Sequence, residues 1–205
     1  MINNHFERLK IVLSLFGVVL LLSACAPRFM QVRRAELLYK EGQVLLSKGK
    51  QEEAMVRFEK SVALARNAGF KAGVAHNFNE MAIIHTARGA YGKARALLTE
   101  AVDIYKEAHM DPEVSKALNN IALTYVRERD FKEAMHQYEA LVTWDRETDN
   151  LLGEGITLYN MGLIYAHYLG EGKEARKKYS EALKIFRKLG NEKYIRVVEK
   201  QMGNE

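Results

Sequence analysis

Proline and cysteine are the residue types that this 205-residue chain uses least, with two prolines and one cysteine. Proline inside a helix costs about 3 kcal/mol, so its scarcity permits long helices. The single cysteine, Cys25, cannot form a disulfide within the chain. The fold must therefore be held together by packing alone.

Motifs for catalysis and for metal or phosphate binding are also missing. None of the six histidines stands in an HExxH pattern or another metal-ligand spacing, and the chain has no GxSxG and no phosphate loop. The net charge is +5, but lysines and arginines alternate with glutamates instead of forming a basic stripe. We therefore expect no enzyme activity, no cofactor, no metal, no small-molecule substrate and no nucleic-acid partner.

What the chain does have is a repeat of about 40 residues. Three positions recur in four copies: a small residue, an alanine twelve or thirteen residues later, and a large residue four after that. A small side chain lets two helix backbones approach closely, and a large one fills the space beside it. The four copies are Gly42, Ala54 and Phe58; Ala82, Ala94 and Leu98; Ala122, Ala134 and Tyr138; and Gly162, Ala175 and Tyr179.

The repeat predicts an all-α fold of four helix hairpins with a C-terminal capping helix. The repeats cover about 35–70, 71–110, 111–150 and 151–190, and the capping helix covers 191–202. The expected helix pairs are 31–47 with 51–67, 72–88 with 91–108, 112–128 with 131–147, and 151–168 with 173–189. The last interval is 41 residues, which we assign to one extra residue in the hairpin at Leu169–Gly172.

This pattern resembles the tetratricopeptide repeat (TPR), which places a small residue, an alanine and an aromatic residue at the same relative positions. The period of 40, in place of 34, resembles the longer repeats of kinesin light chains. The resemblance covers about 35–202. It implies an α-solenoid whose concave groove binds protein or peptide partners.

In that family the first helix of each pair lines the concave face. The corresponding residues here combine amides, tyrosines, aliphatic side chains and a few charges. Two interpretations of the asparagines stay open: they bind the backbone of an extended peptide, or they tie neighbouring helices together. The candidate partner-binding residues are Tyr39, Gln43, Asn79, Ile83, Lys116, Asn119, Asn120, Leu123, Arg127, Tyr159 and Asn160.

Residues 1–24 have the features of a signal peptide, with a basic start and an apolar run too short to span a bilayer comfortably. The sequence Leu-Ser-Ala-Cys that ends at Cys25 resembles the lipobox of bacterial lipoproteins, which implies cleavage before Cys25 and a lipid on its sulfur. An ordinary secretory signal with a coincidental cysteine is the alternative. By the same family's sorting rule, Ala26 implies an outer-membrane anchor facing the periplasm, or the cell membrane if there is only one.

Residues 25–34 are interpreted as the lipidated cysteine and a short tether. Its arginines, Arg28, Arg33 and Arg34, either contact anionic lipid headgroups or belong to a solvated linker. Together these features predict a membrane-anchored periplasmic scaffold that binds protein partners in cell-envelope assembly. The alternative is a lipoprotein that binds cell-wall glycan or regulates a peptidoglycan hydrolase, with Tyr39 and Tyr159 stacking on sugars.

Overall fold

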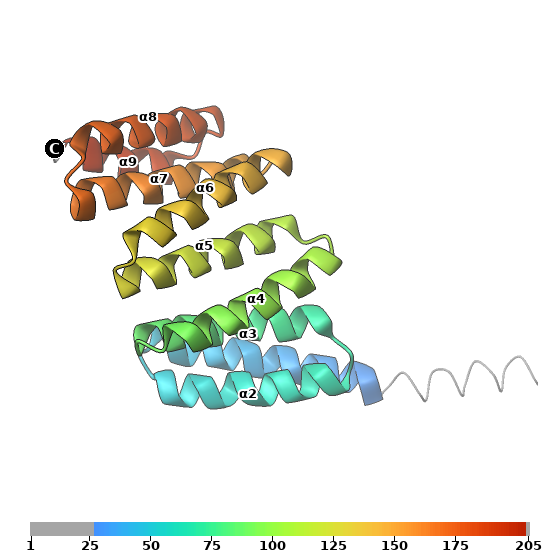
Figure 1. Ribbon diagram of the computed structural model, residues 1–205. Helices are drawn as coiled ribbons and strands as arrows, with labels where there is room; N and C mark the ends of the chain where they lie inside the picture. Colours follow the sequence, from blue (N-terminus) through green and yellow to red (C-terminus); the bar gives the residue numbers. More distant parts are fainter. Residues whose placement is uncertain (1–26, 204–205) are drawn as a thin grey trace, which may run out of the picture. The chain divides into compact units, whose positions relative to one another are not determined.

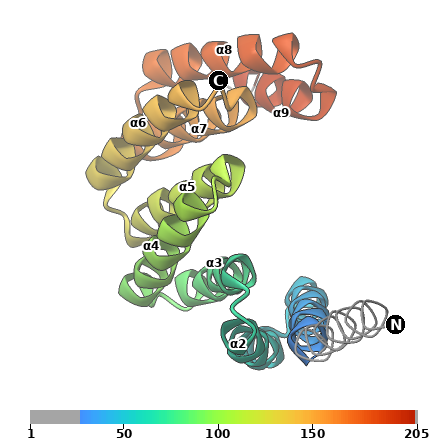
Figure 2. The same cartoon turned by 90° about the vertical axis from the view of Figure 1, so that its right-hand side faces the viewer.

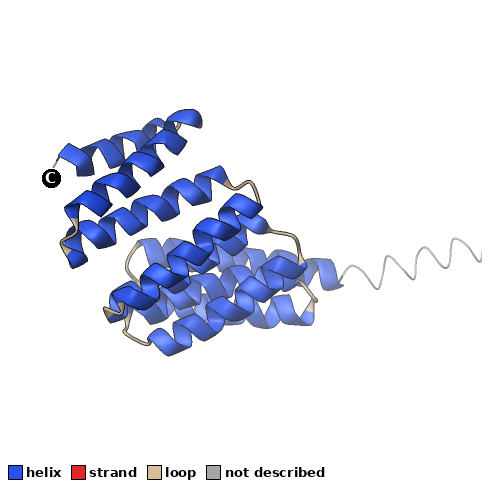
Figure 3. Ribbon diagram, turned by 45° about the horizontal axis from the view of Figure 1, so that its top comes forward, coloured by secondary structure: helices blue, strands red, loops and turns tan. Residues whose placement is uncertain are grey.

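The computed structural model describes residues 27–203, and within that range it contains helices and turns but no strand (Figure 3). The predicted all-α class is thus confirmed. The predicted signal peptide and Cys25 lie outside the described residues. A first helix at 27–47 is followed by α2 (Gln51–Asn67), α3 (Lys71–Ala87), α4 (Tyr91–Glu107), α5 (Asp111–Glu128), α6 (Phe131–Glu147), α7 (Leu151–Ile164), the π-helical turn η1 (Tyr165–Leu169), α8 (Gly172–Lys188) and α9 (Glu192–Gly203).

The predicted helix bounds agree with these to within a residue or two, except for the first helix and for α7, which is followed by η1 from Tyr165. The first helix is already formed at residue 27, so residues 27–34, expected as a tether, are helical. They are also attached to the fold, because Arg28 Nε donates to the carbonyl of Ala68 at 2.6 Å. The described fold thus already includes residue 27, two residues after Cys25.

The chain divides within α3 into two compact units, one ending at Asn77 and the other beginning at Phe78. In the N-terminal unit, the first helix and α2 form a hairpin, joined by the ion pair between Arg57 and Glu41 at 3.2 Å. In the C-terminal unit, α4 packs on α5, α5 on α6, α6 on α7, α7 on α8, and α8 on α9 (Figures 1 and 2).

The small and large residues of the repeat meet inside each hairpin, as their spacing predicts. Ala122, Ala134 and Tyr138 are all buried in the third hairpin. In the first and fourth hairpins the small residue is glycine because an aromatic ring occupies the place of a Cβ. A Cβ on Gly42 would lie 2.5 Å from the ring of Phe58, and one on Gly162 would lie 2.5 Å from the ring of Tyr179.

The extra residue of the fourth repeat lies at the end of the helix and not in the loop. In three hairpins a backbone N–H bonds to the carbonyl five residues earlier, as from Asp130 to Tyr125 at 2.9 Å. In the fourth, the N–H of Glu171 bonds to the carbonyl of Tyr165, six residues earlier, also at 2.9 Å. The wider π-helical turn at Tyr165–Leu169 takes up the additional residue, which corrects the placement at Leu169–Gly172.

Candidate functional site

The predicted binding residues of α5 form one continuous stripe. Lys116, Asn119, Asn120, Leu123 and Arg127 are spaced by three, one, three and four residues, which keeps them on one side of the helix, and all keep some exposure. At 1.5 Å per residue, the distance from Lys116 to Arg127 along the helix is about 16 Å, the length of about five extended residues. The stripe is long enough to contact a short extended segment of a partner.

The C-terminal part of this stripe borders a groove of about 740 Å³ between α3, α4 and α5. Its floor is apolar, with Leu98 buried and Ile83 39% exposed. Four of the predicted binding residues line this groove. The sequence pattern did not indicate its α4 residues, Tyr91 and Leu98, because it considered only the first helix of each pair. The groove is lined by Ile83, Thr86, Ala87, Tyr91, Leu98, Asn120, Leu123 and Arg127.

Contacts between α4 and α5 hold one wall of the groove in place. The Tyr91 hydroxyl donates to the carbonyl of Arg127 at 3.0 Å, and Arg95 Nη1 donates to Glu128 Oε2 at 2.6 Å. The guanidinium of Arg95 also lies over the ring of Tyr125, 4.3 Å from its centre. The side chain of Arg127 stays exposed beside this wall, so the groove has a fixed apolar floor and a cation at its rim.

The asparagines connect one repeat to the next. Asn120 Nδ2 donates to Asn79 Oδ1 at 2.8 Å, which joins α5 to α3, and Asn160 Nδ2 donates to Asn119 Oδ1 at 2.8 Å, which joins α7 to α5. The interpretation that these amides tie neighbouring helices is thus confirmed. Asn79 is 3% exposed and acts from inside the fold, while the other three are partly exposed, so peptide contact by them stays a prediction.

A smaller recess of about 260 Å³ lies between α5 and α7, at the N-terminal end of the α5 stripe. Lys116 and Asn119 line it, together with Ile156. The recess also borders Thr157 and Asn150, and both of these donate hydrogen bonds to Asp145, at 3.4 and 2.8 Å.

Asp145 is a buried carboxyl group that the sequence reasoning did not single out. Burial raises its pKa, and hydrogen bonds from Ser115, Asn150 and Thr157 partly oppose that shift. Comparison of the four repeats could have identified this residue. The same position holds Ala65, Tyr105 and Phe186 in the other hairpins, so an acid there is the exception.

Tyr159 packs on the aromatic residue of its own hairpin. Its ring centre is 5.9 Å from that of Tyr179, at an angle of 38°. Burial raises the pKa of the Tyr159 hydroxyl, and a hydrogen bond with Gln201 of α9 opposes the shift. The ring is therefore half-buried, and its position is fixed by α8 and α9.

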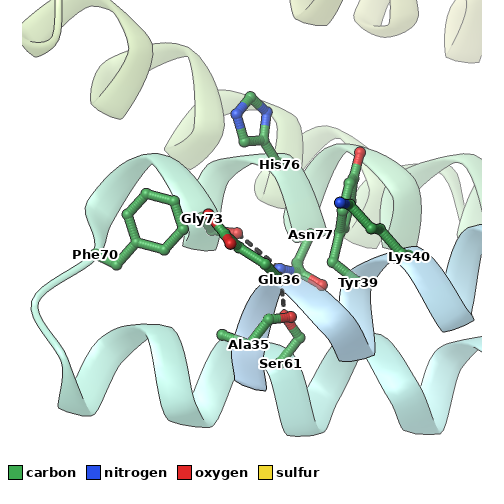
Figure 4. A pocket seen from close by; sticks show the side chains of 9 residues that line it. All are labelled: Ala35, Glu36, Tyr39, Lys40, Ser61, Phe70, Gly73, His76 and Asn77. Atoms are coloured by element: carbon green, nitrogen blue, oxygen red, sulfur yellow. Dashed lines mark hydrogen bonds between the residues drawn. The ribbon is translucent and has the colours of Figure 1, made fainter. Parts of the chain in front are cut away.

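The N-terminal unit has its own pocket, of about 280 Å³, which contains the predicted residue Tyr39 (Figure 4). The Tyr39 ring lies between Phe58, at 6.0 Å, and His76, at 6.1 Å, measured between ring centres. Gln43 Nε2 donates to the Tyr39 hydroxyl at 2.9 Å, so the two predicted residues of this unit lie together. The pocket is lined by Ala35, Glu36, Tyr39, Lys40, Ser61, Phe70, Gly73, His76 and Asn77.

A short chain of buried hydrogen bonds connects three helices beneath this pocket. Ser61 Oγ donates to the carbonyl of Ala35 at 2.7 Å, and Asn77 Nδ2 donates to Ser61 Oγ at 3.0 Å and to the carbonyl of Gly73 at 2.7 Å (Figure 4). The two acceptors, Ser61 Oγ and the Gly73 carbonyl, determine which way the Asn77 amide points. These hydrogen bonds join the first helix, α2 and the start of α3 into one unit.

Within residues 27–203, no three side chains among histidine, cysteine, aspartate and glutamate gather as a metal site would require. No described helix combines the length and the apolar composition that crossing a membrane takes. Of the predicted site residues, only Cys25, the predicted lipidation site, lies outside the part of the chain that the structure describes.

Comparison with known families identifies the repeat. Two models, both described as tetratricopeptide repeat, match residues 35–67 and 72–147. Together they cover more than half of the chain. Among curated protein sequences, none matches significantly.

Solved structures with the same fold come from several kinds of protein. Aspartyl phosphate phosphatase F of Bacillus subtilis is 14% identical, with a TM-score of 0.74 over 82% of this chain and 44% of its own. The apo form of RapI is 15% identical, with a TM-score of 0.66 over 83% of this chain and 64% of its own. A protein of Podosopora anserina described as a kinesin light chain with nearly identical TPR-like repeats is 18% identical, with a TM-score of 0.60 over 77% of each chain. The chain spans less than two thirds of the first two proteins, and the likeness is one of fold.

Proposed function

Because the chain belongs to the tetratricopeptide-repeat family, we propose that it is a scaffold that holds an extended segment of a protein partner against α3, α4 and α5. The observation that carries this proposal is the groove of about 740 Å³, whose floor is apolar and whose rim carries Asn120 and Arg127. TPR folds typically act as protein-interaction scaffolds, and neither family model indicates a catalytic family.

The groove favours a particular kind of segment. An apolar side chain of the partner fits the floor formed by Ile83, Leu98 and Leu123. Asn120 uses its amide N–H to bind Asn79, so its carbonyl oxygen can accept from another donor, such as a peptide N–H. Arg127 favours an acidic group at one end of the segment, and Lys116 favours one about 16 Å away along α5.

Matched charge reversals test the groove. Leu123→Glu with Arg127→Glu places two acids on the groove and changes its charge by −3, while Lys132→Glu changes the charge of an exposed residue of α6 by −2. We expect the double variant to lose photo-crosslinked partner in native membranes at least tenfold, with an unchanged circular dichroism spectrum and melting temperature. Wild-type crosslinking by a folded double variant, or an equal loss in Lys132→Glu, contradicts the proposal.

We further propose that the scaffold is a lipoprotein anchored through Cys25 and exposed to the periplasm, where it takes part in cell-envelope assembly. The support is the Leu-Ser-Ala-Cys sequence directly after an apolar run. Metabolic labelling with an alkyne fatty acid is expected to mark the wild-type chain and not Cys25→Ser. An unlabelled wild-type chain overturns the anchor and leaves the groove proposal standing.

A further inference from the structure

The outward face of the first helix carries large apolar side chains that no other described part of the protein covers. Met30, Leu37 and Val44 recur every seven residues, which places them on one side of the helix, and they are 66%, 58% and 52% exposed. Arg33 and Arg34 lie between them and are also exposed. We call these five residues the N-terminal stripe.

The positions of Leu37 and Val44 are buried in every later repeat. The counterparts of Leu37 are Asn77, Ala117 and Thr157, and those of Val44 are Ile84, Thr124 and Ile164; none is more than 2% exposed. In the C-terminal unit, α5 and α7 bury these positions against the helices that precede them, α4 and α6. The N-terminal stripe is thus the stacking surface of the repeat, without a preceding helix on it.

The two arginines make this surface unsuitable for another helix. The counterparts of Arg34 are Val74, Val114 and Glu154, all buried, and those of Arg33 are Gly73, Glu113 and Gly153. The one buried charge among them, Glu154, is paired with Arg146 at 2.6 Å. A helix packed at the usual 8–10 Å would bury the guanidinium groups at a large desolvation cost unless it placed an acid opposite each of them, as Arg146 is paired with the buried Glu154. A second copy of the chain would face the same cost.

A membrane interface accommodates the same residues without that cost. Apolar side chains enter the boundary between headgroups and acyl chains, while arginines stay hydrated and bind phosphates. Met30, Arg33, Arg34 and Leu37 also border a groove of about 690 Å³ with Leu64 of α2, so apolar and cationic groups share one recess.

We propose that the N-terminal stripe lies on an anionic phospholipid surface, with Met30 and Leu37 at the acyl boundary and Arg33 and Arg34 on lipid phosphates. This inference rests on the proposed lipid anchor, because Cys25 precedes Met30 by only five residues, at most about 12 Å since 27–30 are helical. The acyl chains would hold the stripe at the surface, and the stripe would orient the N-terminal unit there. The described helix already includes residue 27, two residues after Cys25.

A fluorescent probe on the lipidated protein tests the orientation. Lipidation blocks the only natural cysteine, so Leu37→Cys offers one reactive thiol, and Lys132→Cys on α6 serves as the matched control. Each protein is placed in vesicles of phosphatidylglycerol and phosphatidylethanolamine that contain brominated acyl chains. We expect severalfold stronger quenching at position 37 than at position 132.

Charge reversal isolates the contribution of the arginines. Arg33→Glu with Arg34→Glu is expected to lower the ratio of docked to undocked protein at least about 25-fold, since each arginine near an anionic surface contributes about fivefold. Replacing phosphatidylglycerol with phosphatidylcholine is also expected to lower the ratio of docked to undocked protein. Vesicles containing only phosphatidylcholine therefore serve as the second control.

Three outcomes overturn the inference. Equal quenching at positions 37 and 132 shows that the stripe does not reach the membrane, and quenching insensitive to lipid charge removes the role of the arginines. Protection of position 37 that rises with protein concentration in solution shows a second copy on the stripe. Fatty-acid labelling of Cys25 is scored separately, so that a failed anchor is distinguished from a failed stripe.

Discussion

The two outer hairpins and the two inner hairpins solve the same packing problem differently. The first and fourth place glycine against an aromatic ring, Gly42 against Phe58 and Gly162 against Tyr179. Three residues before each glycine stands a tyrosine, Tyr39 or Tyr159, whose ring tilts against that aromatic residue at 6.0 or 5.9 Å.

The second and third hairpins have alanine in place of the glycine, at Ala82 and Ala122, and asparagine in place of the tyrosine, at Asn79 and Asn119. These asparagines bond to the next first helix, to Asn120 and Asn160. The comparison teaches that the small position and the residue three before it change together. An aromatic pair stabilises a hairpin internally, whereas an amide pair joins it to its neighbour.

The largest effect is expected at the alanine position that is fully buried in both kinds of hairpin. Ala134 is fully buried beside Tyr138, so Ala134→Leu adds three carbons to a filled space. We expect a loss of about 3 kcal/mol in the free energy of unfolding, measured by urea denaturation. The matched Lys132→Leu, on the exposed side of the same helix, should change it by less than about 0.5 kcal/mol. Equal midpoints for the two variants would contradict the repeat register.

Giving an outer hairpin the inner type of residue should cost less. Gly162→Ala brings a Cβ to 2.5 Å from the ring of Tyr179, which must move and disturb Tyr159. We expect a net loss of about 1–2 kcal/mol in thermal or urea unfolding, because the gain in helix propensity offsets part of the strain. Gly162→Ala together with Tyr179→Leu, which reproduces the second hairpin, should recover most of it. Without recovery, the glycine and the ring are not coupled.

Breaking one amide pair should have a smaller effect still. Asn160→Ala removes the bond to Asn119 Oδ1, so we expect a loss of about 1 kcal/mol in stability. Asn160→Ala and Asn119→Ala should not add up in the double variant, since they remove the same bond. Additive losses would show that the two amides act on different partners.

The smallest effect is expected at Asp145, a position where the other hairpins have no acidic residue. Burial raises the pKa of this carboxyl group in the folded state, so the folded chain holds the proton more tightly than the unfolded chain. Its contribution to stability is full below pH about 4 and is lost as pH rises through the raised value. We expect Asp145→Asn to flatten that part of the stability–pH curve. An unchanged slope in urea unfolding between pH 4 and pH 8 would contradict this.

Much of the fold could be predicted because the same pattern of small and large residues recurs in four copies. The spacing of the small and large residues defined the hairpins, and most helix ends followed from it. The helical conformation of residues 27–30 could not be predicted in this way, because no preceding repeat sets the register of the first helix. The π-helical turn at Tyr165–Leu169 was also beyond reach, since a 41-residue interval shows that one residue is added but not where the backbone widens.

The candidate site was predicted only in part, for a related reason. The concave-face positions on the first helix of each pair include Ile83, Asn120, Leu123 and Arg127, and in the structure these four residues line one groove. This choice of positions missed Tyr91 and Leu98, because the second helix contributes where two helices converge, and no spacing on one helix reveals that. The asparagines had two interpretations, and only the geometry showed that they bond to one another.

The central claim is that the groove between α3, α4 and α5 is where a partner binds. The most direct measurement is photo-crosslinking in native membranes from a benzoylphenylalanine placed at Leu123, with the same residue at Lys132 as control. The account predicts one discrete protein adduct at position 123 that is lost when Arg127→Glu is added, and no such adduct at position 132. The same adduct from position 132, with none from position 123, would contradict it.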